Sequence, residues 1–273
     1  MTLSIITINC NNRAGLQRTI DSVVCQTWKD YEWIVIDGGS TDGSKELIEQ
    51  YQDRFAYWCS EPDKGIYNAM NKGVEHAHGD YVNFMNSGDC YAAAGVLEKA
   101  FSVPRSEDII TGQVIRSDNG EWLRKYDDNL LIQVYTDTIN HQGSFIKREL
   151  FKDKRYDENL KIVSDWKFWV ETIILGDANV QVINDVVAIQ DMEGISNVDW
   201  DLMNMERQQV LDKTIPHSLQ NLFNEYRDLK RSSYYIRINY LKHNSPFLLG
   251  LVRKVLALLL LMNGVTKKKL RNG

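Results

Sequence analysis

The chain has 273 residues, is 43% hydrophobic and carries a formal net charge of −5 at neutral pH. This length and apolar content are enough for a substantial core, either in one large domain or in one domain with an appendage. Nonspecific nucleic-acid binding depends on clustered Lys and Arg that neutralise phosphates, and a mildly acidic chain is poorly suited to it. No nucleic-acid partner is therefore expected.

The four cysteines, Cys10, Cys25, Cys59 and Cys90, form no CxxC pair and have no His at zinc-ligand spacing. They are expected to be small buried apolar residues in a reducing cytosol, not disulfides or metal ligands. The N-terminus has no basic region before its first apolar run, so it predicts a strand and not a signal peptide. We therefore expect a cytoplasmic location.

The first 90 residues alternate between short β-branched apolar runs and segments with apolar residues at helical spacing. Strands are predicted at 3–8, 33–36, 55–59 and 81–85, and helices at 16–24, from about 44 to 51, and at 66–77. The alternation indicates βαβ units and a largely parallel sheet. Polar loops at 9–13, 37–43 and 86–89 follow strands directly, so they are expected to meet at the carboxyl edge of the sheet, where such sheets bind ligands.

The pattern changes after residue 105. Strands are predicted at 109–115 and 121–126, joined by a Ser-Asp-Asn-Gly hairpin turn, and at 143–147, 180–183 and 186–189. A helix containing Trp166 and Trp169 is expected to be capped by Ser164. From about residue 200 the chain is predicted to be helical to its end.

Several common nucleotide and catalytic motifs are absent, among them GxGxxG after the first strand, the P-loop, HExxH and GxSxG. Residues 34–43, Ile-Val-Ile-Asp-Gly-Gly-Ser-Thr-Asp-Gly, instead place Asp37 at the end of a buried strand, before a helix start. One interpretation is a capped strand-to-helix turn, with Ser40 or Asp42 as the cap. The alternative is that Asp37 also accepts a hydrogen bond from a nucleotide base.

Five segments together resemble family 2 glycosyltransferases: residues 4–7, 11–12, 22–27, 34–43 and 63–73. The resemblance is strong to residue 90 and thinner from there to about 190. It implies an α/β GT-A (nucleotide-diphospho-sugar transferase) fold, with a mostly parallel central sheet flanked by helices and a helical C-terminal extension. The expected domains are 1–198, with a nucleotide-sugar half at 1–104 and an acceptor half at 105–198, and an extension at 199–273.

The resemblance also implies a set of ligand contacts. Thr7 and Asp37 would contact the nucleotide, with Asp37 on the base, and the 63–72 segment would line the nucleotide-sugar site. The expected nucleotide-sugar-binding residues are Thr7, Asn9, Asp37, Lys64, Asn68, Asn86 and His141. On the helix at 66–77, Ile66, Met70 and Val74 are expected in the core, whereas Tyr67, Asn68, Asn71 and Lys72 point elsewhere and are compatible with ordinary solvated surface.

Residues 86–89, Asn-Ser-Gly-Asp, occupy the place of the family's DxD motif. A departing nucleoside diphosphate develops negative charge, and a divalent cation that bridges its phosphates neutralises that charge. Only the last carboxylate, Asp89, is retained here, with Asn86 at the first position. The resemblance implies Mn²⁺ or Mg²⁺ held by Asp89, phosphate oxygens and water. Without the family context the same residues would be an ordinary turn after a strand.

Asp165 matches the family's acidic position near the acceptor and is the expected catalytic base, because inversion by direct displacement requires removal of the acceptor hydroxyl proton. The alternative is a first-turn Asp favoured by the helix dipole. His141 precedes the strand at 143–147, and family members often carry a His here. It is expected near the diphosphate or the acceptor, unless it is purely structural.

The apolar segment at 247–262 is divided by Arg253 and Lys254 and followed by Lys267–Lys269 and Arg271, so a membrane-spanning helix is not expected. Two alternatives remain for residues 246–271: peripheral contact with the inner face of the cytoplasmic membrane, or packing on protein.

The sequence thus predicts a metal-dependent inverting glycosyltransferase of surface polysaccharide synthesis. It would move a hexosyl or N-acetylhexosaminyl group from a nucleotide-sugar donor, UDP-linked by first expectation, to a glycan or lipid-linked saccharide acceptor. One rival, a sugar-phosphate nucleotidyltransferase, would need a glycine-rich basic loop after the first strand, where Asn11, Asn12 and Arg13 stand instead. The other is a non-catalytic glycan-binding or assembly protein, suggested by the incomplete DxD motif.

Overall fold

The computed structural model describes residues 1–122, 126, 129–192 and 199–262. The chain forms two compact units, Met1–Ile215 and Pro216–Gly273. The expected boundary at residue 198 stays a prediction. The two compact units meet after Ile215, so the helix at Trp200–Thr214 belongs to the first unit.

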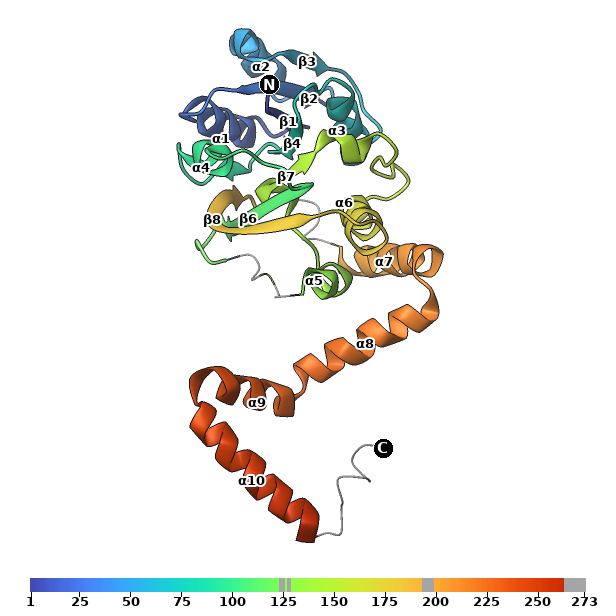
Figure 1. The fold of residues 1–273 in the computed structure, drawn as a ribbon. Coiled ribbons are helices and arrows are strands. Elements are labelled where there is room, and N and C mark those ends of the chain that lie inside the picture. Colours follow the sequence, from blue (N-terminus) through green and yellow to red (C-terminus); the bar gives the residue numbers. More distant parts are fainter. Residues whose placement is uncertain (123–125, 127–128, 193–198, 263–273) are drawn as a thin grey trace. The chain divides into compact units, whose positions relative to one another are not determined.

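The first unit is built on an eight-stranded sheet with the order β3-β2-β1-β4-β7-β6-β8-β5 (Figure 1). Neighbours pair in parallel at β1–β2, β2–β3, β1–β4 and β6–β8, and antiparallel at β4–β7, β6–β7 and β5–β8. This arrangement confirms the expected mostly parallel α/β sheet. The strands are β1 (Leu3–Asn9), β2 (Tyr31–Asp37), β3 (Tyr57–Ser60), β4 (Tyr81–Phe84), β5 (Cys90–Tyr91), β6 (Ile109–Arg116), β7 (Ser144–Lys147) and β8 (Val180–Gln190).

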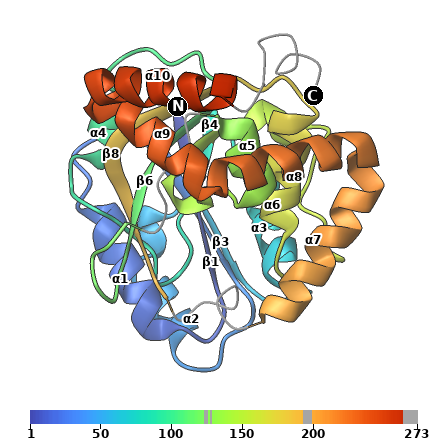
Figure 2. The same cartoon turned by 90° about the horizontal axis from the view of Figure 1, so that it is seen from below.

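Helices cover both faces of this sheet. The helices are α1 (Arg13–Val24), α2 (Ser44–Gln50), α3 (Ile66–Glu75), α4 (Val96–Phe101), α5 (Leu130–Thr136), α6 (Ser164–Trp169) and α7 (Trp200–Thr214). Figures 1 and 2 show α1 and α4 on one side of the strands and α3 and α6 on the other. Every residue of β1 is buried, as expected for a central strand covered on both faces. Gly73 lets α3 approach β1 closely, because a Cβ there would collide with the side chain of Ile6.

Three sequence predictions need correction. The helix at 164–169 is capped at Val163, and the Ser164 hydroxyl instead accepts the Asp157 N–H. The two strands expected at 180–183 and 186–189 form one strand, β8, whose register shifts against β6. The strand expected at 121–126 lies largely outside the described residues, and its described part includes a bridge between Ile115 and Trp122. All four cysteines are free as expected, but none is fully buried: Cys10 and Cys25 are exposed, and Cys59 and Cys90 are partly buried.

The second unit contains α8 (His217–Arg231), α9 (Ser233–Asn244) and α10 (Pro246–Met262), which confirms the expected helical extension over the described residues. Consecutive helices of this unit contact each other, α8 with α9 and α9 with α10. Within the described ranges, no helix combines the length and apolar character needed to cross a bilayer. Lys267–Lys269 and Arg271 lie outside the described residues.

Candidate active site

A cavity of about 590 Å³ opens where the chain leaves the carboxyl ends of β1 and β4. Asn9, Asn86 and Asp89 line it from the strand ends and the loops after them, His141 lines it from the short turn before β7, and Asp165 lines it from the start of α6. Because β1 and β4 are parallel neighbours, their following loops emerge at the same edge. The structure therefore brings together five of the nine residues predicted for the site.

Asp37 and Thr7 lie behind this cavity and do not line it. The Asp37 carboxylate is fully buried and accepts hydrogen bonds from Asn9 Nδ2 at 2.7 Å, the Ser40 hydroxyl at 2.6 Å and the Ser60 hydroxyl at 2.6 Å. Burial opposes ionisation, but these bonds outweigh it and lower the pKa of Asp37. The Thr7 hydroxyl accepts the Trp33 indole N–H at 3.0 Å. Asp37 thus ties the end of β1 at Asn9 to Ser40 and Ser60, and its contact with a base stays a prediction.

Lys64 and Asn68 are also outside the cavity lining. The Lys64 backbone N–H donates to Asn68 Oδ1 at 3.2 Å, and Asn68 Nδ2 donates to Glu158 at 2.9 Å. Their neighbours Asp63 and Gly65 do line the cavity. In this conformation the hydrogen bond between Lys64 and Asn68 lies at the N-terminal end of α3. The contact of these two residues with ligand stays a prediction.

A chain of polar contacts joins the two halves of the cavity. Asn86 Nδ2 lies 3.2 Å from His141 Nε2, and His141 Nδ1 lies 3.2 Å from Asp165 Oδ2. Both contacts are satisfied when the ring proton is on Nδ1, because Nε2 then accepts from Asn86 and Nδ1 donates to Asp165. His141 therefore fixes the orientation of the Asp165 carboxylate with respect to the loop after β4.

Asp165 is held as a carboxylate. Its burial raises the pKa, but the hydrogen bond and charge of His141, the Trp166 backbone N–H and the Tyr67 hydroxyl outweigh burial, so the pKa is lowered. The Tyr67 hydroxyl lies 2.5 Å from the Ile162 carbonyl oxygen and 3.1 Å from Asp165 Oδ1, and it has one proton to share between them. Asp165 lines the cavity with its side chain 18% exposed, so an ionised acceptor of protons faces the space where substrates would lie.

The turn from Asn86 to Asp89 carries two side-chain oxygen groups of different kinds, an amide on Asn86 and a carboxylate on Asp89. Gly88 adopts φ +104°, and a side chain there would collide with Asp191, so the turn requires glycine. Asp89 Oδ1 accepts the Asp191 backbone N–H at 2.8 Å, and burial raises the pKa of Asp89 to about 6. Asn86 Oδ1 is buried without a hydrogen-bond partner.

These two groups allow a test of whether a divalent cation fits. The described residues contain no cluster of three or more His, Cys, Asp or Glu side chains that would bind a cation by themselves. A buried carboxylate at Asp89 and an orphaned amide oxygen at Asn86 nevertheless line one cavity. Hard cations such as Mg²⁺ and Mn²⁺ accept such oxygens and take their remaining ligands from phosphates and water. The residues fit a cation that arrives with a nucleoside diphosphate.

The sequence analysis missed several residues of the site. Tyr67 and Asn71 are buried, 6% and 7% exposed, and are not the solvated surface suggested by their place off the apolar stripe of α3. Lys161 and Asp191 also line the cavity, although no motif marks them. The only signals were positional: Lys161 lies four residues before Asp165, and Asp191 directly follows the strand at 180–190.

Helix α7 braces the segment that leads into α6. The Glu206 carboxylate is 4% exposed and accepts the backbone N–H groups of Lys161, Ile162 and Val163, at 2.7, 3.0 and 3.3 Å. The Arg207 guanidinium lies over the Trp166 ring, 4.4 Å from its centroid. Since Asp165 follows this segment directly, α7 fixes the position of the proposed base from outside the cavity.

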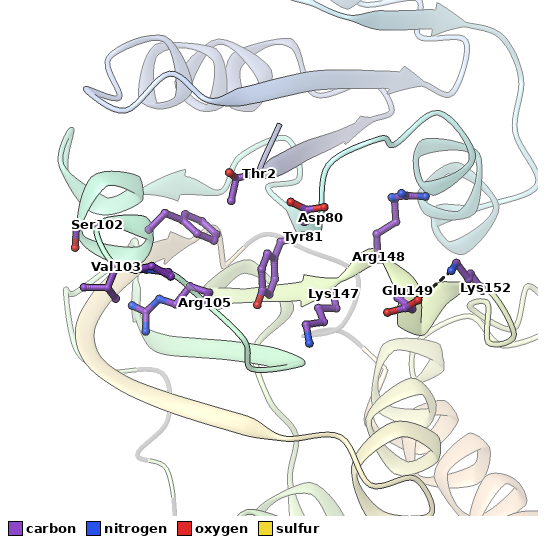
Figure 3. Close-up of a pocket in the computed structure, with 12 residues that line it drawn as sticks. Thr2, Asp80, Tyr81, Ser102, Val103, Arg105, Lys147, Arg148, Glu149 and Lys152 are labelled. Atoms are coloured by element: carbon purple, nitrogen blue, oxygen red, sulfur yellow. Dashed lines mark hydrogen bonds and ion pairs between the residues drawn. The ribbon is translucent and has the colours of Figure 1, made fainter.

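A second cavity, of about 700 Å³, lies at the opposite edge of the sheet (Figure 3). It is lined by Thr2 before β1 and by Tyr81 at the start of β4, so it faces the amino ends of these parallel strands. Its cations already have protein partners: Lys147 with Asp108, Lys152 with Glu149, Arg148 with the Gly79 carbonyl and Arg105 with the Ala100 carbonyl. Although this cavity is larger, none of the residues predicted for catalysis or ligand binding lines it.

The sequence profile of glycosyl transferase family 2 matches residues 4–164, more than half of the chain. Over 100 residues the chain is 46% identical to an uncharacterised glycosyltransferase of Mycobacterium tuberculosis, a match that spans 36% of this chain and only 38% of that relative. Over 213 residues it is 29% identical to a PGL/p-HBAD biosynthesis glycosyltransferase of Mycobacterium bovis, covering 75% of this chain and 82% of the relative.

Two solved structures share the fold at 16% sequence identity. TarS of Staphylococcus aureus, residues 1–349 in complex with UDP-GlcNAc, superposes with a TM-score of 0.64 over 90% of this chain and 76% of that one. The mannosyltransferase PcManGT of Pyrobaculum calidifontis, in complex with GDP-Man and Mn²⁺, superposes with a TM-score of 0.59 over 95% and 80%. The expected GT-A architecture is thereby confirmed. The chain belongs to glycosyl transferase family 2.

Proposed function

We propose that this chain transfers a monosaccharide from a nucleoside-diphosphate sugar to a hydroxyl group of a glycan or lipid-linked acceptor, with inversion at the anomeric carbon. The observation that carries the proposal is the placement of Asp89 and Asp165 on one cavity, with His141 and Asn86 between them. Asp89 suits the diphosphate side, because it follows β4 at the edge where parallel sheets bind nucleotides. Asp165 suits the acceptor side as an ionised base.

The chemistry assigned to these residues is a single displacement. Asp165 accepts the proton of the acceptor hydroxyl as its oxygen attacks the anomeric carbon, and the bond from that carbon to the diphosphate oxygen breaks. His141 donates to Asp165 Oδ2 and holds the carboxylate in place while the proton arrives. A divalent cation bound at Asp89 and Asn86 would neutralise the charge that develops on the diphosphate.

The donor is proposed to be UDP-linked and to carry a hexosyl or N-acetylhexosaminyl group. The TarS complex with UDP-GlcNAc supports this choice by fold, whereas the PcManGT complex with GDP-Man shows that the same fold also accepts a guanine nucleotide. The biosynthetic name of the Mycobacterium bovis relative supports a glycan or glycolipid product. A location at the inner face of the cytoplasmic membrane, in surface polysaccharide synthesis, is part of the same proposal.

The proposal is tested by separating donor binding from transfer. Asp165→Asn should abolish transfer but keep nucleotide binding, because Asp165 lies on the acceptor side and its amide preserves the size of the side chain. Asp201→Asn is the matched control, since Asp201 is exposed and occupies the first turn of α7 as Asp165 occupies that of α6. Full transfer activity in Asp165→Asn would show that the base is misassigned. Nucleotide binding without turnover on any donor in the wild type would favour the non-catalytic alternative.

A further inference from the structure

The charge of the chain is distributed unevenly. The net charge is −5 overall, yet residues 216–273 contain 11 Lys and Arg residues against two acidic residues, Glu225 and Asp228. No Asp or Glu follows Asp228 in the remaining 45 residues. The second unit is therefore a basic element attached to an acidic one.

Helix α10 presents a broad apolar surface. At about 100° per residue, its exposed apolar side chains occupy roughly half of the helix circumference. These are Phe247, Leu248, Leu251, Val252, Val255, Leu256, Leu258, Leu259 and Met262, with Phe247 83% exposed. Arg253 and Lys254 lie on the opposite side of the helix, together with Gly250, Ala257 and Leu260. An arc this wide exceeds the narrow seam that a helix buries against one partner helix.

Helix α9 adds aromatic and basic groups to the same unit. Tyr234 and Tyr240 are exposed, 62% and 65%, and Arg237 and Lys242 lie on the same helix. Tyrosine suits the boundary between lipid and water because its ring is apolar and its hydroxyl is polar. Arg and Lys suit it because their long apolar stems lie along the lipid while the charge reaches the headgroups.

We propose that α9 and α10 bind the surface of a membrane that contains anionic lipids, with α10 lying in the plane of the interface. The acid-free charge of this segment complements anionic headgroups, and the apolar arc of α10 enters the acyl boundary. The 17 residues of α10 extend about 25 Å as a helix, less than a spanning segment needs, which agrees with an in-plane orientation. This inference deepens the membrane location given in the proposed function, but it uses no residue of the cavity, so vesicle binding and sugar transfer can fail separately.

The full-length protein is sedimented with vesicles of phosphatidylcholine alone and of phosphatidylcholine with phosphatidylglycerol, at low and high salt. We expect binding to the anionic vesicles only, weakened by salt. Leu251→Glu should abolish binding, and Arg253→Gln with Lys254→Gln should weaken it about 30-fold, at about fivefold for each cation. Leu175→Glu is the matched control, because Leu175 is exposed to a similar degree, 47% against 52% for Leu251, but lies in the first unit.

Two other occupants of the apolar arc would overturn the proposal. A second copy of the chain would give a dimer in size-exclusion chromatography with light scattering that Leu251→Glu converts to a monomer, without vesicle binding. Packing on the first unit would give slow amide hydrogen exchange along α10 in the absence of lipid. Equal binding of Leu251→Glu and wild type to anionic vesicles would also contradict it.

Discussion

Asp89 provides a test of the site that needs no substrate. Burial raises its pKa from the ordinary value of 3.8 to about 6, so the folded protein holds a proton there that the unfolded chain releases at lower pH. Below about pH 4 both states are protonated and the group has no effect. Between about pH 4 and pH 6 the unfolded chain binds fewer protons, so the free energy of unfolding falls as pH rises, and above pH 6 the loss is constant.

The loss can be sized from the shift. About two pKa units at about 1.4 kcal/mol each correspond to roughly 3 kcal/mol at neutral pH in the metal-free protein. Asp89→Asn removes the ionisation and keeps an oxygen that can accept the Asp191 N–H. The variant should therefore be more stable than wild type by up to about 3 kcal/mol at pH 8 in EDTA, and no more stable at pH 4, although it loses transfer activity.

The assay is denaturant unfolding of both proteins in EDTA across this pH range. Asp108→Asn is a control of opposite sign. Burial raises the pKa of Asp108, but its hydrogen bonds to the Asn179 N–H and to Lys147 outweigh this and lower it. The stability that Asp108 contributes is present above its unfolded pKa and lost as pH falls, so Asp108→Asn should destabilise mainly at neutral pH. If Asp89→Asn were less stable than wild type at pH 8, or its advantage were the same at pH 4, the buried-carboxylate account would be refuted.

Three further predictions follow from the same contacts. His141→Ala should lower kcat by about 10²-fold or more, with nucleotide affinity measured by calorimetry nearly unchanged, because Asp165 loses the hydrogen bond that orients its carboxylate and lowers its pKa. In the pH profile of kcat/KM, the acidic limb should have its midpoint near pH 6, and the midpoint should move to lower pH as the Mn²⁺ concentration is raised, because protons and metal compete for Asp89. A midpoint that does not change with Mn²⁺ concentration would contradict this. Glu206→Ala should destabilise the protein by at least about 1–3 kcal/mol in denaturant unfolding, because buried N–H groups at 161–163 lose their acceptor.

The parts of the fold that the sequence predicts are those with local signals. The parallel strands β1, β2 and β4 are rich in β-branched and aromatic residues, and α3 has a clear apolar stripe, so these elements and the polar edge of the sheet can be predicted. The short elements α4 and α5 lack such a signal and emerge only from packing. The register shift in β8 likewise depends on its partner β6 and not on its own residues.

The same distinction applies to the site. Asp89 and Asp165 are predicted by the resemblance to family 2 glycosyltransferases, because each stands at an acidic position of the family in the right order along the chain. Tyr67 was misplaced because helical periodicity reports only one apolar face, and its burial comes from Tyr156 and the loop before Asp165, almost 100 residues away. Glu206 was missed because its partners are backbone N–H groups, which leave no pattern in a sequence.

The measurement that tests the central claim most directly is ligand-induced thermal stabilisation with UDP, GDP and dTDP, each with and without Mn²⁺. It is made on wild type, Asp89→Asn and Asp165→Asn. A ligand that binds only the folded state stabilises it by about 2.7 kcal/mol at 100 times its Kd. The account predicts a Mn²⁺-dependent shift with one nucleotide that persists in Asp165→Asn and is lost in Asp89→Asn. No shift with any nucleotide in wild type, or a full shift retained in Asp89→Asn, would contradict it.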